Sequence, residues 1–393
     1  MLEAYLKKRT PNPADQDVRM AMGKKASIVG IVTNLAFAGF KIGVGFLTGG
    51  ISMIADGMNN LMDMLSSIIS LIGFHFASMP ADSNHPYGHA RMEYFASFLV
   101  SVIILWTGGS LMWQSIKSIL DPGVIDATPL AVVVLLLSIL GKLFLYRYNL
   151  ILGKRMDSEL LVATAYDARG DMFATGAVLL SLIATSMLSF NIDGWMGLIV
   201  AAIIAKSGWE SLRETVDSLL GQKTDPQLLR NILDDIKRFP VTLGVHDVMY
   251  HDYGATHRFL TLHVEVDSER NVMDIHQDID EIERYIAKKY HMNTTIHMDP
   301  IRIDDPRSNA LYDYVKENLH KIDPSLDLHD FRIVNRKDGL NLVFDVLVPM
   351  HLKNRKRFID KALRAHIASS HPEYELRITY DLDYQNILGV ENE

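Results

Sequence analysis

Long apolar runs dominate the first half of the chain. Six of them are long enough to cross a bilayer, because a helix of about 20 apolar residues spans its hydrocarbon core. They lie at residues 26–48, 51–78, 94–119, 128–150, 159–188 and 194–213. The pattern predicts an α-helical membrane domain of six transmembrane helices over residues 26–219, preceded by a polar, basic segment over residues 1–25.

The pattern then changes to short alternating strands and amphipathic helices. The predicted helices are residues 226–239 and 272–290, and the predicted strands are residues 245–251, 258–267 and 293–299. The order αββαβ predicts an α+β, ferredoxin-like cytoplasmic domain over residues 220–302.

The same order recurs, which predicts a second ferredoxin-like cytoplasmic domain over residues 303–393. A predicted helix over residues 307–320 opens this copy. Three strand segments echo the first copy: His329–Val334 repeats His246–His251, Leu342–Val348 repeats Leu260–Val266, and Arg377–Asp381 repeats Thr295–Asp299. We interpret the two copies as a tandem duplication.

Charge and composition indicate the orientation of the chain in the membrane and limit its partners and metal ligands. Arg91, Lys154 and Arg155 lie in loops on the same side as the basic N-terminal segment, so the positive-inside rule places both termini in the cytoplasm. We therefore expect a multi-pass membrane protein, surrounded by lipid. A net charge of -8 argues against nucleic acid as a partner. Cysteine is absent, so any metal must be held by Asp, Glu, Asn or His.

Two of the apolar runs contain polar pairs with helical spacing. Asn59 and Asp63 are four residues apart and share one helix face, and Asp167 and Asp171 form a matching pair. Acids in the middle of a span are costly unless they have a function. Two helices that each offer oxygen ligands at i and i+4 can form a cage of four oxygens around one divalent cation.

Alternatives remain open beside these pairs. Asp56 and Asn60 lie close by, and the pattern does not distinguish direct ligation from a supporting or packing role. The acids could also form structural ion pairs, for example with Lys41 or Lys142.

Further candidate metal ligands lie outside the apolar runs. Asp82, His85 and His89 fall within eight residues of a loop, which predicts either a metal clip or a polar turn. The first cytoplasmic copy has candidate ligands on its strands and helix: His246, His263, His276, His297 and Asp299. The second copy has lost most of the imidazoles, so we expect its metal site to be degenerate.

These residues resemble the cation diffusion facilitator family over about residues 20–300. The resemblance rests on Ala55-Asp56-Gly57 before the first pair, on His85-Pro86-Tyr87-Gly88-His89, on the second pair, and on His297-Met298-Asp299-Pro300. It implies a homodimeric exporter with six helices per protomer, which exchanges a cytoplasmic divalent cation for protons by alternating access. It also implies metal ligands at the three sets of positions named above, with the cytoplasmic set acting as a sensor.

The type of ligand bears on which metal is transported. Zinc members of the family typically place His at the first position of one or both pairs, where this chain has Asn59 and Asp167. Oxygen ligands favour Mn²⁺ over Zn²⁺, with Fe²⁺ next. The chain thus resembles the bacterial manganese-efflux branch, which implies a multi-pass protein of the bacterial cytoplasmic membrane. We expect Mn²⁺ as substrate, with Fe²⁺, Zn²⁺ or Co²⁺ efflux as alternatives and Zn²⁺ or Mn²⁺ at the regulatory sites.

The expected mechanism is competition between metal and protons. Three carboxylates around a divalent cation leave the site at 1- if none is protonated. Without a histidine at the site, the exchanged protons must sit on carboxylates. A passive divalent cation channel is the competing class, although channels more readily use rings from identical helices. A membrane metallohydrolase is not expected, because no apolar run contains a motif such as HExxH.

Overall fold

The structure is a computed structural model that describes residue 6 and residues 15–48, 51–121, 129–188, 193–221, 224–254, 257–303, 305–336 and 339–382. The chain forms two compact units. The helical unit contains Met1–Gln222 and the short segment Asp252–His257, and the second unit contains Lys223–His251 and Arg258–Glu393.

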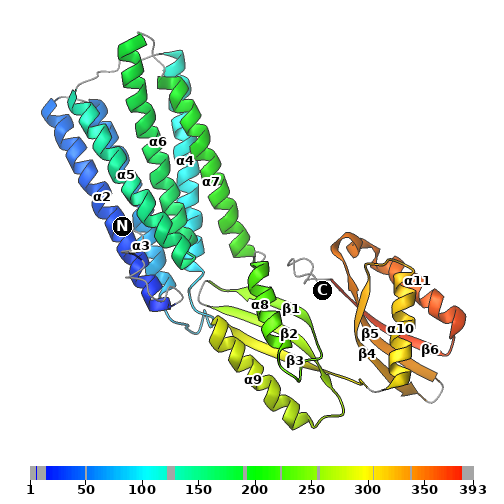
Figure 1. Cartoon of the computed structure of the whole chain (residues 1–393). Helices are drawn as coiled ribbons and strands as arrows, with labels where there is room; N and C mark the ends of the chain where they lie inside the picture. Colours follow the sequence, from blue (N-terminus) through cyan, green and yellow to red (C-terminus); the bar gives the residue numbers. More distant parts are fainter. Residues whose placement is uncertain are drawn as a thin grey trace. The chain divides into compact units, whose positions relative to one another are not determined.

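The helical unit is built from long helices that run side by side (Figure 1). They are α2 (Gln16–Thr48), α3 (Ile51–Ala77), α4 (Met92–Leu120), α5 (Pro129–Met156), α6 (Glu159–Leu188) and α7 (Asp193–Leu220). Each coincides with one predicted apolar run, but α2 begins before residue 26. The reason is that its polar first turns pack inside the unit, where the side chains of Arg19 and Met20 are buried.

Four stretches in the described residues are long and apolar enough to cross a membrane. They are Asp17–Val44, Gly57–Ala77, Met92–Leu120 and Val132–Met156. The described part of α6 is excluded by composition, since Asp167, Arg169 and Asp171 follow one another closely in it. The membrane domain is therefore confirmed as helical, and the sixfold span count stays a prediction.

Small residues bring the helices close together. The hydroxyls of Ser70 and Thr164 are 2.9 Å apart between α3 and α6, and those of Ser101 and Ser211 are 2.8 Å apart between α4 and α7. A Cβ at Gly57 would lie 2.6 Å from Cγ1 of Ile42, so α2 and α3 approach each other only because this residue is glycine. Such contacts are typical of helices that pack within a bilayer.

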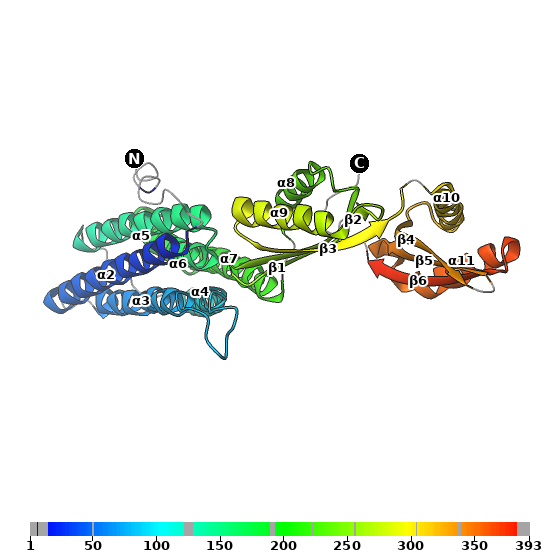
Figure 2. The same cartoon turned by 90° about the horizontal axis from the view of Figure 1, so that it is seen from below.

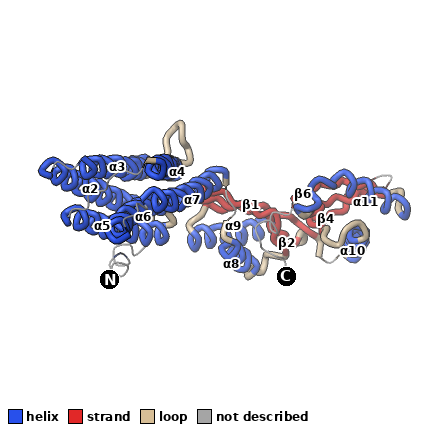
Figure 3. The backbone as a smooth tube through the Cα atoms, turned by 90° about the horizontal axis from the view of Figure 1, so that it is seen from above, coloured by secondary structure: helices blue, strands red, loops and turns tan. Residues whose placement is uncertain are grey.

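The described strands belong to the second unit, apart from Asp252 at the end of β1 (Figure 3). Its first half contains α8 (Pro226–Lys237), β1 (Gly244–Asp252), β2 (Arg258–Asp267), α9 (Val272–Tyr290) and β3 (Asn293–Ile301). Its second half contains α10 (Pro306–His320), β4 (Asp327–Arg336), β5 (Gly339–Val348), the 3₁₀ turn η1 (Met350–Arg355), α11 (Lys356–Ser370) and β6 (Tyr374–Leu382). Figure 2 shows α8 and α9 beside the first sheet and α10 and α11 beside the second.

Each half has one three-stranded sheet, in the order β1-β2-β3 or β4-β5-β6. β2 and β3 are parallel, as are β5 and β6, whereas β4 and β5 are antiparallel. Alternating Leu and Val side chains on β2 and β5 form the centre of a separate apolar core in each half. The predicted α+β unit with a mixed sheet is thus confirmed.

The two halves also share local details. Asp225 and Asp305 each cap the helix that opens their half, accepting a backbone hydrogen bond, and a proline follows each of them. Asp247 and Asp330 each have a φ of 50°, a left-handed conformation that few residues other than glycine adopt. These matching irregularities support the interpretation of a duplication.

A buried carboxylate ties α8 to α9 in the first half. Asp235 accepts hydrogen bonds from the Lys289 ammonium and, at 2.6 Å, from the Tyr290 hydroxyl. Burial alone would raise the pKa of Asp235, but these hydrogen bonds outweigh it and hold the pKa below its usual range.

Candidate metal centres

The acids of α3 and α6 meet at a lysine. Nζ of Lys142, on α5, donates to Oδ2 of Asp63 at 2.8 Å and to Oδ2 of Asp171 at 2.6 Å. All three side chains are largely buried, and that of Lys142 is only 4% exposed. At about 1.5 Å per residue, each of the three lies roughly 18–21 Å along its helix from the end next to the 78–91 and 157–158 loops. The structure thus brings carboxylates from two helices together around one ammonium.

The remaining members of the predicted cage lie differently. Asp167, one turn before Asp171 on α6, is buried. Asn59 is exposed, whereas Asn60 is buried and its Oδ1 accepts a hydrogen bond of 2.8 Å from Nζ of Lys41. Of the four predicted ligands, Asn59 is thus the one whose side chain is exposed in this conformation. The side chain of Asp56 lies outside the described part of the chain.

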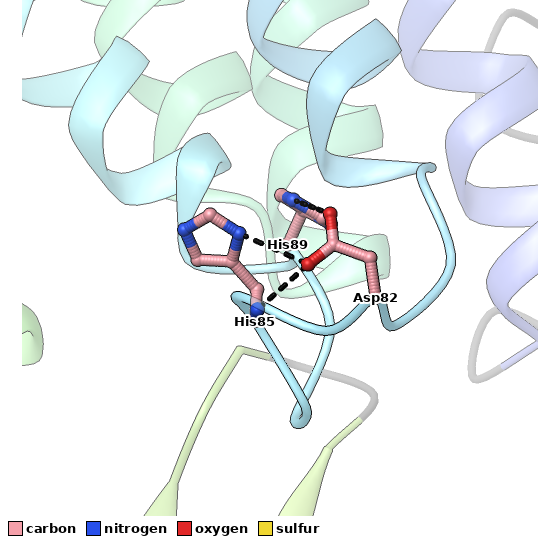
Figure 4. A group of neighbouring side chains, drawn as sticks. All are labelled: Asp82, His85 and His89. Carbon is pink, nitrogen blue, oxygen red and sulfur yellow. Dashed lines mark hydrogen bonds and ion pairs between the residues drawn. The ribbon is translucent and has the colours of Figure 1, made fainter.

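The three predicted loop ligands lie together (Figure 4). Oδ1 of Asp82 is 3.4 Å from Nδ1 of His85, and Oδ2 of Asp82 is 3.5 Å from Nε2 of His89. One ligand atom from each residue falls within 4.8 Å of the other two. Asp82 also accepts the backbone N–H groups of Asn84 and His85, which fold the loop around it. The hydrogen bond from the His85 N–H contributes most to holding the pKa of Asp82 below its usual range.

A backbone carbonyl orients one imidazole of this loop. Nδ1 of His89 lies 3.1 Å from the oxygen of Pro80, which can only accept, so Nδ1 donates its hydrogen there. Nε2 is then the nitrogen with a free lone pair, and it faces Asp82. Metal-binding histidines are commonly fixed in this way. The donor set of two imidazoles and one carboxylate suits Zn²⁺ and is compatible with Mn²⁺.

Arg91, which follows this loop, contacts the short segment Asp252–His257. Its Nη2 donates to the carbonyl oxygen of Asp252 at 2.7 Å, and its guanidinium lies 4.2 Å from the ring centre of Tyr253. The ring of Tyr87 is 5.0 Å from that of Tyr253. The loop that carries the candidate site is therefore fixed against Asp252 and Tyr253, which belong to the same unit.

A buried ion pair that the sequence reasoning missed closes the same end of the helices. Arg19 on α2 donates to both carboxylate oxygens of Glu93 on α4, at 2.6 and 3.0 Å, and both side chains are 2% exposed. Arg19 also donates to the carbonyl oxygens of Met156 and Asp157, and Ser158 donates to Glu93. In the sequence, Arg19 is one of several basic residues before the first apolar run, and nothing there links it to Glu93.

The first half of the second unit gathers imidazoles around Asp299. Its Oδ2 is 2.8 Å from Nδ1 of His263 and 3.2 Å from Nε2 of His246, and its Oδ1 is 3.3 Å from Nε2 of His297. The strands dictate this arrangement, because His263 and His297 are register partners on β2 and β3. His276 is exposed on α9, away from these contacts in the described structure. Four of the five predicted ligands are thus brought together.

The second half extends the same cluster. The ring of His329, on β4, is 4.3 Å from that of His246, and its Nε2 is 3.6 Å from Oδ2 of Asp247. Asp345 is the register partner of His329 on β5, and Asp381 lies on the neighbouring β6. The predicted degenerate site therefore still holds an imidazole and two carboxylates.

The charged groups in this cluster shift one another's pKa values. Burial lowers the affinity of His246 for a proton, but contacts with Asp247 and Asp299 outweigh it and raise the pKa of His246 to about 9. Contacts with His246 and His329 hold the pKa of Asp247 well below its usual range. Burial raises the pKa of Asp381, and the charges of Asp247 and Asp345 raise it further. A metal that binds at His246 must therefore displace a proton.

Both parts of the chain match models of cation efflux proteins. The cation efflux transmembrane domain matches residues 27–220, and the cytoplasmic domain of cation efflux proteins matches residues 224–301. An uncharacterized transporter of Methanocaldococcus jannaschii is 33% identical over 253 residues, which are 64% of this chain and 89% of the relative.

Two further relatives carry functional names. The manganese efflux system protein MneS of Bacillus subtilis is 28% identical over 289 residues, 71% of this chain and 96% of the relative. The cation-efflux pump FieF of Shewanella oneidensis is 27% identical over 286 residues, 72% of this chain and 95% of the relative. This chain belongs to the cation efflux family, the cation diffusion facilitators, which are membrane transporters and not enzymes.

Proposed function

We propose that this protein exports Mn²⁺ from the cytoplasm in exchange for protons. The observation that carries the proposal is the meeting of Asp63 and Asp171, from two helices, around the ammonium of Lys142 inside the helical unit. An ammonium held by two carboxylates marks a place where a cation is stabilised within the membrane. The names of two Bacillus relatives, both manganese efflux proteins, support Mn²⁺ as the cation.

Lys142 changes the expected charge balance. With the ammonium and three ionised carboxylates, Asp63, Asp167 and Asp171, the empty site carries 2-. Binding of a divalent cation makes it neutral while Lys142 stays charged. The ion and Lys142 compete for Asp63 and Asp171, so Lys142 must move aside when the ion binds. We infer that it returns when the ion leaves, which limits the time that the two acids spend unpaired.

Protons supply the second half of the exchange. Carboxylates that lose the metal can take up protons from the outer side, and these protons are released to the cytoplasm when the next ion binds. Asn59 is exposed in this conformation, and a rotation of α3 that brings it toward Asp167 would complete four oxygen ligands. Alternating access requires such a change in ligand geometry between its two states.

The membrane topology, the oligomeric state and the regulatory sites are further parts of the proposal. We propose that α2 to α7 all cross the membrane, that both termini face the cytoplasm and that two chains form a homodimer. The match of residues 224–301 to a dimerising cytoplasmic domain supports the homodimer. The two halves of the second unit are proposed to be duplicated ferredoxin-like domains. The Asp82 and His246 clusters are proposed as regulatory sites for Zn²⁺ or Mn²⁺.

Transport by purified full-length protein in liposomes tests this function. Uptake of Mn²⁺, Fe²⁺, Zn²⁺ and Co²⁺ is followed with metal-sensitive dyes, with and without a pH gradient. We expect Mn²⁺ uptake to be fastest, to accumulate against its gradient and to need the pH gradient. The double variant Asp63→Asn/Asp171→Asn is expected to lose uptake, while Asp217→Asn, an exposed acid on α7, keeps it. Equal Mn²⁺ flux in the double variant and the Asp217→Asn control would contradict the proposal, and uptake that never exceeds equilibrium would favour a channel.

A further inference from the structure

The two halves of the second unit carry the same dipeptide at the same structural position. His246-Asp247 lies on β1 and His329-Asp330 on β4, and both aspartates have a φ of 50°. This backbone turn interrupts the regular alternation of side chains along a strand. The two dipeptides are therefore equivalent in structure as well as in sequence.

The neighbours of His329 also match those of His246. The counterparts of His263 and Asp299 are Asp345 and Asp381, because the parallel pairs share one register. One ligand atom each from His329, Asp345 and Asp381 falls within 4.8 Å of the other two. The second half thus keeps the strand positions of the first cluster, with Asp345 in place of His263 and Thr379 in place of His297.

One ring nitrogen of His329 has no hydrogen-bond partner among the described residues. The side chain of His329 is 11% exposed, and its Nε2 makes no hydrogen bond among the described residues. That nitrogen is directed toward Oδ2 of Asp247, 3.6 Å away in the other half. A nearly buried nitrogen without a hydrogen bond is costly, which indicates that a further group belongs there.

Simple ion pairing does not account for the cluster. Asp345 and Asp381 lie beside His329, and one imidazolium can balance only one of these two charges, whereas Asp247 is also paired with His246. Lys356 also lies near Asp381, but its Nζ donates to the carbonyl oxygen of Tyr380 at 2.7 Å. A divalent cation between these residues would balance the charges of Asp345 and Asp381 and take one ring nitrogen of His329 as its third ligand.

We propose that the second half of this unit binds its own divalent cation through His329, Asp345 and Asp381, next to the first cluster and linked to it by Asp247. The two sites differ in chemistry. The first, with three imidazoles around one carboxylate, suits Zn²⁺, whereas the second, with one imidazole and two carboxylates, suits Mn²⁺. The chain would then sense Mn²⁺ with a site distinct from the imidazole-rich one.

Metal binding to the full-length protein in detergent tests this site. All variants carry Asp63→Asn and Asp171→Asn, so that the transport acids do not contribute. Equilibrium dialysis measures bound Mn²⁺ and bound Zn²⁺ per chain separately. Asp345→Asn and Asp381→Asn are compared with Asp313→Asn, an exposed acid on α10, and size exclusion and circular dichroism establish that each variant is folded.

We expect Asp345→Asn and Asp381→Asn each to lose one equivalent of Mn²⁺ and to keep Zn²⁺, and His263→Ala to show the reverse. Two results would overturn the proposal: Mn²⁺ binding equal to that of Asp313→Asn in both variants, or loss of Zn²⁺ together with Mn²⁺, which would mean that no separate site exists. The readout is binding in a transport-silent background. A negative result would therefore overturn the proposed metal site without bearing on the proposed export.

Discussion

Replacement of Lys142 by methionine is expected to strengthen Mn²⁺ binding and slow its transport. Methionine keeps the length of the side chain and removes the charge that holds Asp63 and Asp171. In the wild type, an incoming ion must displace this ammonium from both carboxylates. In the variant, no ammonium competes with Mn²⁺ for Asp63 and Asp171, but none returns to these carboxylates when the ion leaves.

The size of the effect follows from the two contacts. At an effective dielectric constant of about 20, charges 2.6–2.8 Å apart attract each other by roughly 6 kcal/mol before desolvation is counted. Breaking a buried pair costs about 3–5 kcal/mol in net terms. In the variant, Asp63 and Asp171 can take up protons in place of the lost ammonium, which recovers part of this cost. If about half remains, the dissociation constant for Mn²⁺ falls about 10- to 100-fold, since 1.4 kcal/mol corresponds to tenfold.

Equilibrium dialysis of Mn²⁺ at pH 8 and pH 6, paired with flux into liposomes, measures both effects. The gain in affinity is expected to be larger at pH 8, where fewer protons compete for Asp63 and Asp171. Lys206→Met, which removes a largely exposed lysine of α7, serves as the control and is expected to change neither quantity. Unchanged or weaker Mn²⁺ binding by folded Lys142→Met would refute the idea that the ammonium competes with the ion.

Three further predictions concern other parts of the chain. Glu93→Gln leaves the buried Arg19 without its carboxylate, so the helical unit is expected to lose about 3–5 kcal/mol of stability, seen as a lower melting temperature in detergent; an unchanged value would show that the pair is not structural. His89→Ala is expected to remove one metal equivalent from the loop, measured by dialysis against Zn²⁺, and an unaltered equivalent would argue for a polar turn. Asp235 has a lowered pKa when folded, so its charge stabilises the protein above the unfolded value of about 4 and this stabilisation is lost as the pH falls. Urea titrations of Asp235→Asn are therefore expected to show a deficit at pH 7 that shrinks toward pH 3, and a constant deficit would contradict this assignment.

Much of the architecture could be predicted from periodicity. The six apolar runs predicted the helices α2 to α7, since long apolar stretches are typical of helices that could cross a bilayer. The repeated αββαβ pattern gave both sheets, down to the echo of His246-Asp247 by His329-Asp330. The start of α2 was missed because its first turns are polar yet packed inside the unit, and local polarity does not report such packing.

The candidate sites were predictable where ligands are close in the sequence. Asp82, His85 and His89 converge because one short loop contains them. The position of Lys142 was harder to predict, since it required knowing which face of α5 points toward α3 and α6. The contact between His329 and His246 was hard to predict for a related reason: counting imidazoles in the second copy does not show that the two rings lie side by side.

The central claim is that the transported ion binds between the acids of α3 and α6 and displaces Lys142. Anomalous scattering from crystals of the full-length protein grown with Mn²⁺ tests it most directly. We predict a manganese peak within coordination distance of Asp63 and Asp171, with the ammonium of Lys142 withdrawn from both. Manganese bound elsewhere in the helical unit, with Lys142 still bridging the two carboxylates, would contradict the account.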